Sequence, residues 1–223
     1  MTAPARVSAA AQTPWLPALD QTVEGLDPFR HWLLRDILPD GMGDRIRALP
    51  FQAPPVDDTA GRRETHNPSR LFFGADAQAR HPVCAALAAA YQDPRTVARL
   101  EDLCGIRLGG TSLRIEYCLD TAGFWLEPHT DIGVKRLTHL IYLSTEPGSE
   151  AWGTDLLAPD GTLVARAPAT PNSGLVFVPA RDTWHGFAPR PMQGVRRTLI
   201  VNYVGCEWRA RNELAFPDQP VRS

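Results

Sequence analysis

Hydrophobic and polar residues are patterned differently in the two halves of the chain, and helical signals cluster in the first half. The stretch 27–38 begins with Asp-Pro, a favourable cap and first-turn pair, ahead of a run rich in apolar residues. The Ala- and Leu-rich stretch 82–105 is broken near Pro94 and closed by Gly105. We therefore predict helices in both stretches.

From Thr111 onward the chain changes to short segments rich in β-branched and aromatic residues. They are separated by Gly, Pro, Asp and Asn, which is the pattern of strands joined by turns. The predicted strands lie in 111–119, 136–144, 152–158, 174–179, 184–188 and 196–204. Helices followed by many short strands predict a mainly β fold with N-terminal helices packed on a sandwich or barrel.

The same patterns divide the chain into four parts. We expect a disordered leader over 1–26, a helical support region over 27–110, a β core over 111–206 and a tail over 207–223. Residues 51–70 are long for a passive connection, so they are a candidate lid or substrate loop.

Composition narrows the classes of partner. A chain of 223 residues with 43% hydrophobic content can bury a full core as one enzyme-sized domain. The formal charge of −2 and the absence of Lys/Arg runs argue against nucleic acid and membrane partners. The four cysteines lie far apart without metal-ligand spacing, so we expect reduced thiols in a cytoplasmic protein.

One cluster of residue types points to a metal. If 125–131 ends or borders a strand, His129 and Asp131 point to the same side and can reach one ion. His185 lies between a strand-like segment and a Gly-Phe turn, where a later strand would bring it across the barrel. Two imidazoles and one carboxylate on one face of an ion leave other positions open, which suits a non-haem Fe(II) centre.

The alternative is that the pair is a chance occurrence, since His-x-Asp is common. The remaining histidines offer no better candidates. His31, His66 and His81 fall in the helical or loop half, and His139 sits in the middle of an apolar strand. We interpret His139 as a core imidazole.

The last predicted strand has one apolar face and one largely polar face. The two sets are Leu199, Val201 and Tyr203, and Arg196, Thr198, Ile200 and Asn202. An arginine and a hydroxyl two positions apart can hold a small carboxylate by a bidentate pair and one hydrogen bond, which favours Arg196 over Arg197. The alternative is that both arginines mark a solvated strand end.

Together these segments resemble the Fe(II)/2-oxoglutarate-dependent oxygenases, and within them the prolyl-4-hydroxylase-like group. The resemblance covers 111–204, from RIEYCLDTAGFWLEPHTD through LTHLIYLS and WGTDLL to NSGLVFVPARDTWHGFAP and GVRRTLIVNYV. The His-x-Asp pair, distal histidine and later basic residue of the family fit His129, Asp131, His185 and Arg196.

The resemblance implies the fold, the cofactors and the reaction. The core would be a double-stranded β-helix, a jelly-roll or cupin-like barrel, that binds Fe(II) through the two histidines and the aspartate. The cosubstrate 2-oxoglutarate would chelate the iron and place its distal carboxylate on Arg196, with O2 as oxidant and ascorbate as a reductant. Related halogenases lack the carboxylate ligand, so the presence of Asp131 favours hydroxylation over halogenation.

The cosubstrate-binding hydroxyls are less clearly assigned. Thr198 follows Arg196 on the same face, and Tyr117 would correspond to the family's tyrosine on the first barrel strand. Tyr117 shares its face with apolar residues, however, so it fits a core position equally well. Thr138 and Tyr142 are the alternative hydroxyls.

The substrate is indicated only by residues near the ligands. Arg62, Arg63, Asn67 and Arg70 suit an anionic or amino-acid-like substrate, although a solvated charged loop explains them equally well. Trp125, Leu126 and Trp184 are candidate pocket walls, and simple packing is the alternative.

We expect a monomeric or homodimeric enzyme that oxidises a small molecule. The rival functions are a peptidyl hydroxylase of the prolyl type and a non-catalytic metal-binding barrel.

Overall fold

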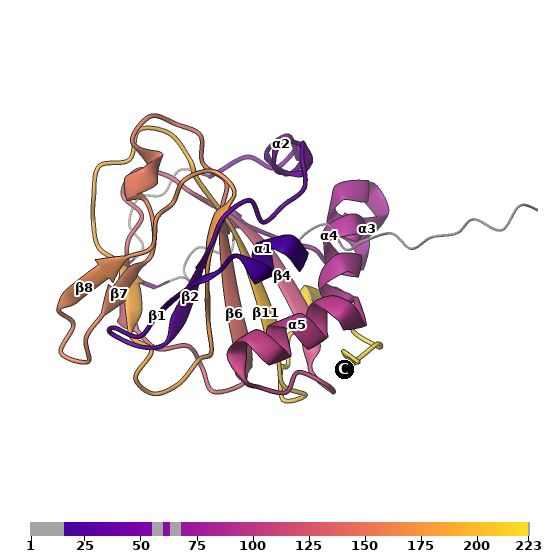
Figure 1. Cartoon of the computed structure of the whole chain (residues 1–223). Coiled ribbons are helices and arrows are strands. Elements are labelled where there is room, and N and C mark those ends of the chain that lie inside the picture. Colours follow the sequence, from indigo (N-terminus) through magenta and orange to yellow (C-terminus); the bar gives the residue numbers. More distant parts are fainter. Residues whose placement is uncertain (1–15, 55–59, 63–67, 223) are drawn as a thin grey trace, which may run out of the picture.

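The computed structural model describes residues 16–54, 60–62 and 68–222, and these residues form two antiparallel β-sheets (Figure 1). The major sheet has seven strands in the order β1-β2-β9-β6-β11-β4-β3, and the minor sheet has four in the order β5-β10-β7-β8. The strands of the major sheet are β1 (Val23–Gly25), β2 (His31–Leu34), β3 (Arg70–Phe72), β4 (Ser112–Asp120), β6 (Lys135–Tyr142), β9 (Ser173–Phe177) and β11 (Arg196–Val204). Those of the minor sheet are β5 (Leu126–His129), β7 (Asp155–Leu157), β8 (Leu163–Arg166) and β10 (His185–Phe187).

Helices cover the outer face of the major sheet. They are α1 (Leu16–Asp20), α2 (Met42–Arg47), α3 (Ala75–Arg80), α4 (Pro82–Gln92) and α5 (Pro94–Cys104). Figure 1 shows α3, α4 and α5 on one side of the major sheet and β7 and β8 on the other. This arrangement is the double-stranded β-helix that the family resemblance implied, with the supporting helices that the sequence predicted.

Strand alternation separates two cores on the two faces of the major sheet. On β11, Leu199, Val201 and Tyr203 join the large cluster that the helices cover. Ile200 faces the opposite way, into a smaller cluster that includes Leu156 of the minor sheet. The inner face of the major sheet is therefore the one that can build a site between the sheets.

The helices predicted in 82–105 are confirmed as α4 and α5. The side chain of Asp93 accepts a hydrogen bond from the backbone N–H of Arg95 (2.8 Å) at the start of α5. Gly105 ends the helix with a φ of 69°, a left-handed conformation that glycine adopts without steric penalty.

The helix predicted in 27–38 is wrong, because this stretch contains the strand β2. Trp32 and Leu34 point into the helix-covered core, whereas Leu33 packs against the inner cluster. β2 pairs with both β1 and β9. Pairing on both sides and burial on two faces outweigh the local helix signals.

Two of the predicted boundaries also need correction. Within the expected leader, residues 16–25 form α1 and β1, and β1 pairs with β2. The expected tail is folded as well: the backbone N–H of Ala215 donates to Leu113 (2.9 Å) and that of Val221 donates to Thr111 (2.8 Å). The sequence showed neither, because both segments depend on distant partners.

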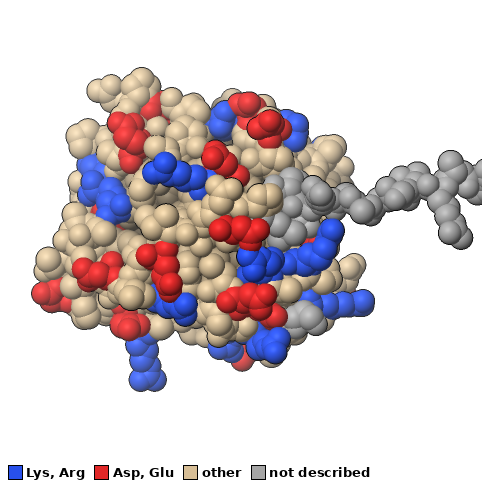
Figure 2. Space-filling view, in the orientation of Figure 1, with Lys and Arg blue, Asp and Glu red and all other residues tan. Residues whose placement is uncertain are grey.

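The structure shows the state of the cysteines, the distribution of surface charge on one face and the lengths of the helices. None of the four cysteines forms a disulfide bond, and Cys206 is exposed whereas the other three are buried. On the face shown in Figure 2, acidic and basic side chains are interspersed. The longest described helices, α4 and α5, have 11 residues each, and no described helix has the length and apolar character needed to cross a bilayer.

Candidate functional site

Two histidines meet across the minor sheet. β5 and β10 are antiparallel neighbours, and their register places His185 directly opposite His129. The two imidazole ring centroids are 4.3 Å apart. Strand pairing alone therefore brings together two residues that are far apart in the sequence.

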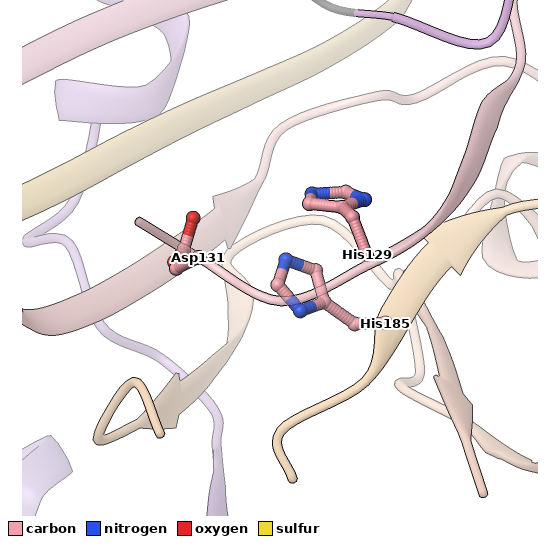
Figure 3. A group of neighbouring side chains, drawn as sticks. All are labelled: His129, Asp131 and His185. Carbon is pink, nitrogen blue, oxygen red and sulfur yellow. The ribbon is translucent and has the colours of Figure 1, made fainter. Parts of the chain in front are cut away.

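Asp131 completes the cluster from the loop that follows β5. Its carboxylate accepts a hydrogen bond from the hydroxyl of Thr138 (2.7 Å) and forms an ion pair with Lys135. The side-chain amide of Asn202 on β11 donates to Thr138 (2.9 Å), so the neighbouring strand fixes that hydroxyl in turn. One ligand atom from each of His129, Asp131 and His185 lies within 4.8 Å of the others (Figure 3).

The hydrogen bonds of both imidazoles select the tautomer that a metal needs. His129 Nδ1 donates to the backbone carbonyl of Glu127 (2.8 Å), and His185 Nδ1 donates to that of Thr183 (2.9 Å). A carbonyl only accepts, so each Nδ1 carries the proton and each Nε2 keeps its lone pair. Such second contacts are typical of metal-ligating histidines.

The protonation states also suit a cation. Burial lowers the pKa of His185 to about 4, so this imidazole is neutral at physiological pH. Burial alone would raise the pKa of Asp131, but the nearby Lys135 and His185 and the hydrogen bond from Thr138 hold that pKa well below its usual range. Asp131 is therefore ionised, and two imidazoles with one carboxylate are the ligand set of non-haem Fe(II) sites.

The cluster opens into a cavity of ≈810 Å³ between the sheets. Arg196, the first residue of β11, lines the same cavity, whereas Arg197 pairs with Glu146 and is absent from the lining. Arg196 Nη1 donates to Asp120 (2.6 Å) and Nε donates to the carbonyl of Trp152 (2.8 Å). Its guanidinium also lies 4.6 Å from the ring centroid of Phe187.

This arrangement leaves part of the Arg196 guanidinium available to a ligand. Among the described residues, Nη2 has no hydrogen-bond partner, and the buried hydroxyl of Thr198 on the same face also has none. A rigidly held guanidinium with a free N–H edge fits the distal carboxylate of 2-oxoglutarate. The residues present thus fit both the metal and the cosubstrate.

The other candidate cosubstrate hydroxyls are placed differently. Tyr117 takes the core position that was its alternative: it belongs to the helix-covered core and is not among the described residues that line the cavity, because its position on β4 faces outward. Thr138 lines the cavity and is bonded to Asp131. Tyr142 is buried on the inner face and donates to Thr154 (2.9 Å), which lines the cavity in its place.

Three of the candidate substrate residues line the cavity, namely Arg62, Arg70 and Leu126. Trp125 and Trp184 are not among the described residues that line it, which agrees with the alternative of simple packing. Each directly precedes a residue that does, and neighbouring residues in extended chain point to opposite sides. Arg63 and Asn67 lie outside the described residues.

The sequence-based predictions did not include several residues that line the cavity. Arg114 and Glu116 lie on the inward face of β4, and strand alternation within 111–119 would have indicated them. Trp208 and Glu213 reach the cavity from the C-terminal segment, and no sequence signal marks them. Lys135 lies four residues after Asp131 and faces it only because the chain turns between β5 and β6.

His139 lies in the helix-side core, as its sequence context suggested. It is buried, and its Nδ1 lies 2.9 Å from the hydroxyl of Tyr91 on α4. Burial lowers its pKa to about 3 from 6.5. Between these two values the unfolded chain binds a proton that the folded chain does not, so the stability that the neutral imidazole contributes is lost as the pH falls.

We expect His139→Ala to lower the free energy of unfolding by about 2–4 kcal/mol at pH 7, because it leaves a cavity and removes the bond to Tyr91. The difference from the parent should shrink towards pH 4.5, since only the parent loses about 1.4 kcal/mol per pH unit from this group. Urea unfolding at pH 7, 6 and 5 measures both effects. A difference that stays constant with pH would mean that His139 does not titrate in this way.

Comparison with known proteins supports the architecture. No family model and no curated protein sequence matches the chain. Among solved structures, a prolyl-4-hydroxylase from Pseudomonas putida matches with a TM-score of 0.52 and 15% identity, over 86% of this chain and 93% of the other.

The chain has the fold of the prolyl-4-hydroxylases. A prolyl hydroxylase from Trichoplax adhaerens, solved with a peptide of hypoxia-inducible factor, matches with a TM-score of 0.52 and 14% identity over 78% of this chain and 83% of the other. HygX from Streptomyces hygroscopicus, solved with nickel and 2-oxoglutarate, matches with a TM-score of 0.52 and 15% identity over 80% of this chain and 84% of the other. These likenesses confirm the double-stranded β-helix that the sequence resemblance implied.

Proposed function

We propose that this protein is an Fe(II)- and 2-oxoglutarate-dependent dioxygenase that hydroxylates an unactivated C–H bond of a small molecule. The observation that carries the proposal is the meeting of His129, Asp131 and His185 in one cavity with Arg196. A metal site alone would need no buried guanidinium with a free edge beside it. The pair of features matches a metal and an anionic cosubstrate together.

Each residue then has a defined physical task. His129 and His185 would hold the metal through Nε2, and Asp131 would hold it through its carboxylate, with Thr138 fixing the orientation of that carboxylate. Arg196 would anchor the distal carboxylate of the cosubstrate, held in place by Asp120 and the carbonyl of Trp152. Bound Fe(II) and 2-oxoglutarate would supply the oxidising chemistry, in which O2 is consumed and succinate and CO2 are released.

A small-molecule substrate is favoured by the way the cavity is walled. Trp208 and Glu213 of the C-terminal segment and Gly61 and Arg62 of the 60–62 segment all contribute to its lining. Its volume of ≈810 Å³ lies within the usual range of about 300–1,000 Å³ for small-molecule sites. Reduced cysteines are consistent with the expected cytoplasmic location, which stays a prediction.

The first test is spectroscopic. Protein purified without oxygen is mixed with Fe(II) and 2-oxoglutarate, and the weak visible charge-transfer band of metal-chelated 2-oxoglutarate is recorded. The proposal expects a band that saturates with 2-oxoglutarate, followed by succinate release when O2 is admitted. Absence of the band together with tight retention of zinc would instead indicate a metal-binding barrel without oxygen chemistry.

A further inference from the structure

A chain of alternating charges lies on the inner face of the major sheet, beside the metal ligands. Arg114 Nε donates to Glu213 (2.7 Å), and Arg114 Nη1 donates to Glu116 (2.8 Å). Arg70 Nη1 makes an ion pair with the same Glu116 at 3.4 Å. The order is therefore Glu213, Arg114, Glu116 and Arg70, with Arg70 at one end.

Arg114 is held at all three of its nitrogen atoms by this row of charged residues and their neighbours. Its Nη2 also donates to Glu116 (3.3 Å), and its Nη1 also reaches Asn202 (3.3 Å). The rings of Phe72 and Trp208 each lie 4.8 Å from its guanidinium. Four of its five N–H groups are thus bonded to described residues, so Arg114 is mainly a structural member of the cluster.

Arg70 differs from Arg114 in having an unused edge. Its side chain is 9% exposed and lines the cavity, and its single ion pair uses Nη1. Its buried Nε has no hydrogen-bond partner, and no described residue bonds Nη2. Nε and Nη2 form one side of the planar guanidinium, the fork that receives a carboxylate through two parallel bonds. A buried N–H without an acceptor is unfavourable, so this edge is best explained by a ligand.

The charged cluster that holds Arg70 is connected by hydrogen bonds to the candidate metal site. Arg114 bonds Asn202, Asn202 bonds Thr138, and Thr138 bonds the metal ligand Asp131. Arg70 and the three candidate ligands line the same cavity. A molecule held at Arg70 therefore shares the space of the candidate metal.

We propose that Arg70 binds a carboxylate of the substrate, so that the molecule oxidised is a small carboxylic acid rather than a neutral compound. This inference rests on the proposed function, because it names the substrate class of the same cavity. The substrate carboxylate extends the alternating chain of charges beyond Arg70. Arg196, paired with Asp120, remains the separate anchor for 2-oxoglutarate.

The test compares acids with their amides. Parent protein, Arg70→Gln, Arg70→Lys and the control Arg107→Gln are first titrated with 2-oxoglutarate under anaerobic Fe(II), and the charge-transfer band is measured. Arg107 is a suitable control because its side chain is 89% exposed and does not line the cavity. A panel of L-amino acids and short monocarboxylic acids, each paired with its primary amide, is then screened by ligand-observed NMR, with and without Zn(II) and 2-oxoglutarate.

We expect at least one acid to bind to the parent and the control, with its amide much weaker. In Arg70→Gln the affinity for that acid should fall about 10- to 100-fold, while the 2-oxoglutarate titration is unchanged. Arg70→Lys should give an intermediate affinity, because it keeps the charge and loses the fork. Folding is checked by urea unfolding, and Glu116 keeps its bonds to Arg114 in both variants.

Three results of the acid-binding screen would overturn the inference. They are binding of no acid in the panel, equal binding of acid and amide, and an Arg70→Gln variant that binds the acid as the parent does. Loss of the 2-oxoglutarate band in Arg70→Gln would also overturn it, by assigning Arg70 to the cosubstrate. A parent protein without any band contradicts the proposed function instead, and the metal-free NMR comparison still decides the role of Arg70.

Discussion

Asp131→Ala is expected to abolish Fe(II)-dependent release of succinate from 2-oxoglutarate. The substitution removes one of three ligands and leaves Lys135 in the site without its counterion, so a positive charge would then face the metal. Loss of an outer partner alone typically lowers metal affinity about 10- to 100-fold, and we expect the loss of the ligand to exceed about 100-fold. Anaerobic Fe(II) titration with metal analysis measures the affinity, and succinate release measures the turnover.

Two further variants test whether the loss of turnover is due to the missing metal ligand. Asp160→Ala changes an exposed aspartate in the turn before β8, so it should leave metal binding and turnover unchanged. His129→Ala should behave as Asp131→Ala does, because it removes a second ligand. Full turnover in Asp131→Ala would refute the proposed metal centre.

The local part of the candidate site was predictable because it depends on strand alternation. His129 and Asp131 are two residues apart, and Arg196 was distinguished from Arg197 by the face it shares with Thr198. The position of His185 opposite His129 required strand pairing, which the family resemblance supplied and the residues alone did not. Short-range periodicity thus identified which side chains point inward, and the fold determined which of them meet.

Two of the wrong or missed predictions depend on contacts between distant parts of the sequence. β2 carries helix signals but is fixed as a strand by β1 and β9. Glu213 reaches the cavity because its segment returns to β4, where it pairs with Arg114. Tyr117 was assigned by analogy although its apolar neighbours placed it correctly on the outer face. A physical reading of alternation would have selected Arg114 and Glu116 in its place.

Arg196→Ala is expected to weaken 2-oxoglutarate binding by at least about 30-fold, because loss of a buried charged partner costs about 2–5 kcal/mol. The anaerobic charge-transfer titration measures this change directly. The same substitution removes the Arg196 guanidinium from the buried Asp120 carboxylate, and we expect it to lower the free energy of unfolding by about 3–5 kcal/mol. Reduced folding could thus be mistaken for reduced binding.

A double variant separates the two effects. Arg196→Gln combined with Asp120→Asn removes both charges and keeps hydrogen-bonding groups of similar size, so stability should recover substantially while the affinity for 2-oxoglutarate stays low. Asp120→Asn alone should bind 2-oxoglutarate less tightly than the parent, because Arg196 loses the partner that holds its guanidinium in place. If the double variant regained parental affinity, Arg196 would act only through folding and the cosubstrate carboxylate would have to bind elsewhere. A stable double variant that binds 2-oxoglutarate more weakly than Asp120→Asn alone would instead establish Arg196 as the anchor, since the guanidinium is then the difference between the two variants.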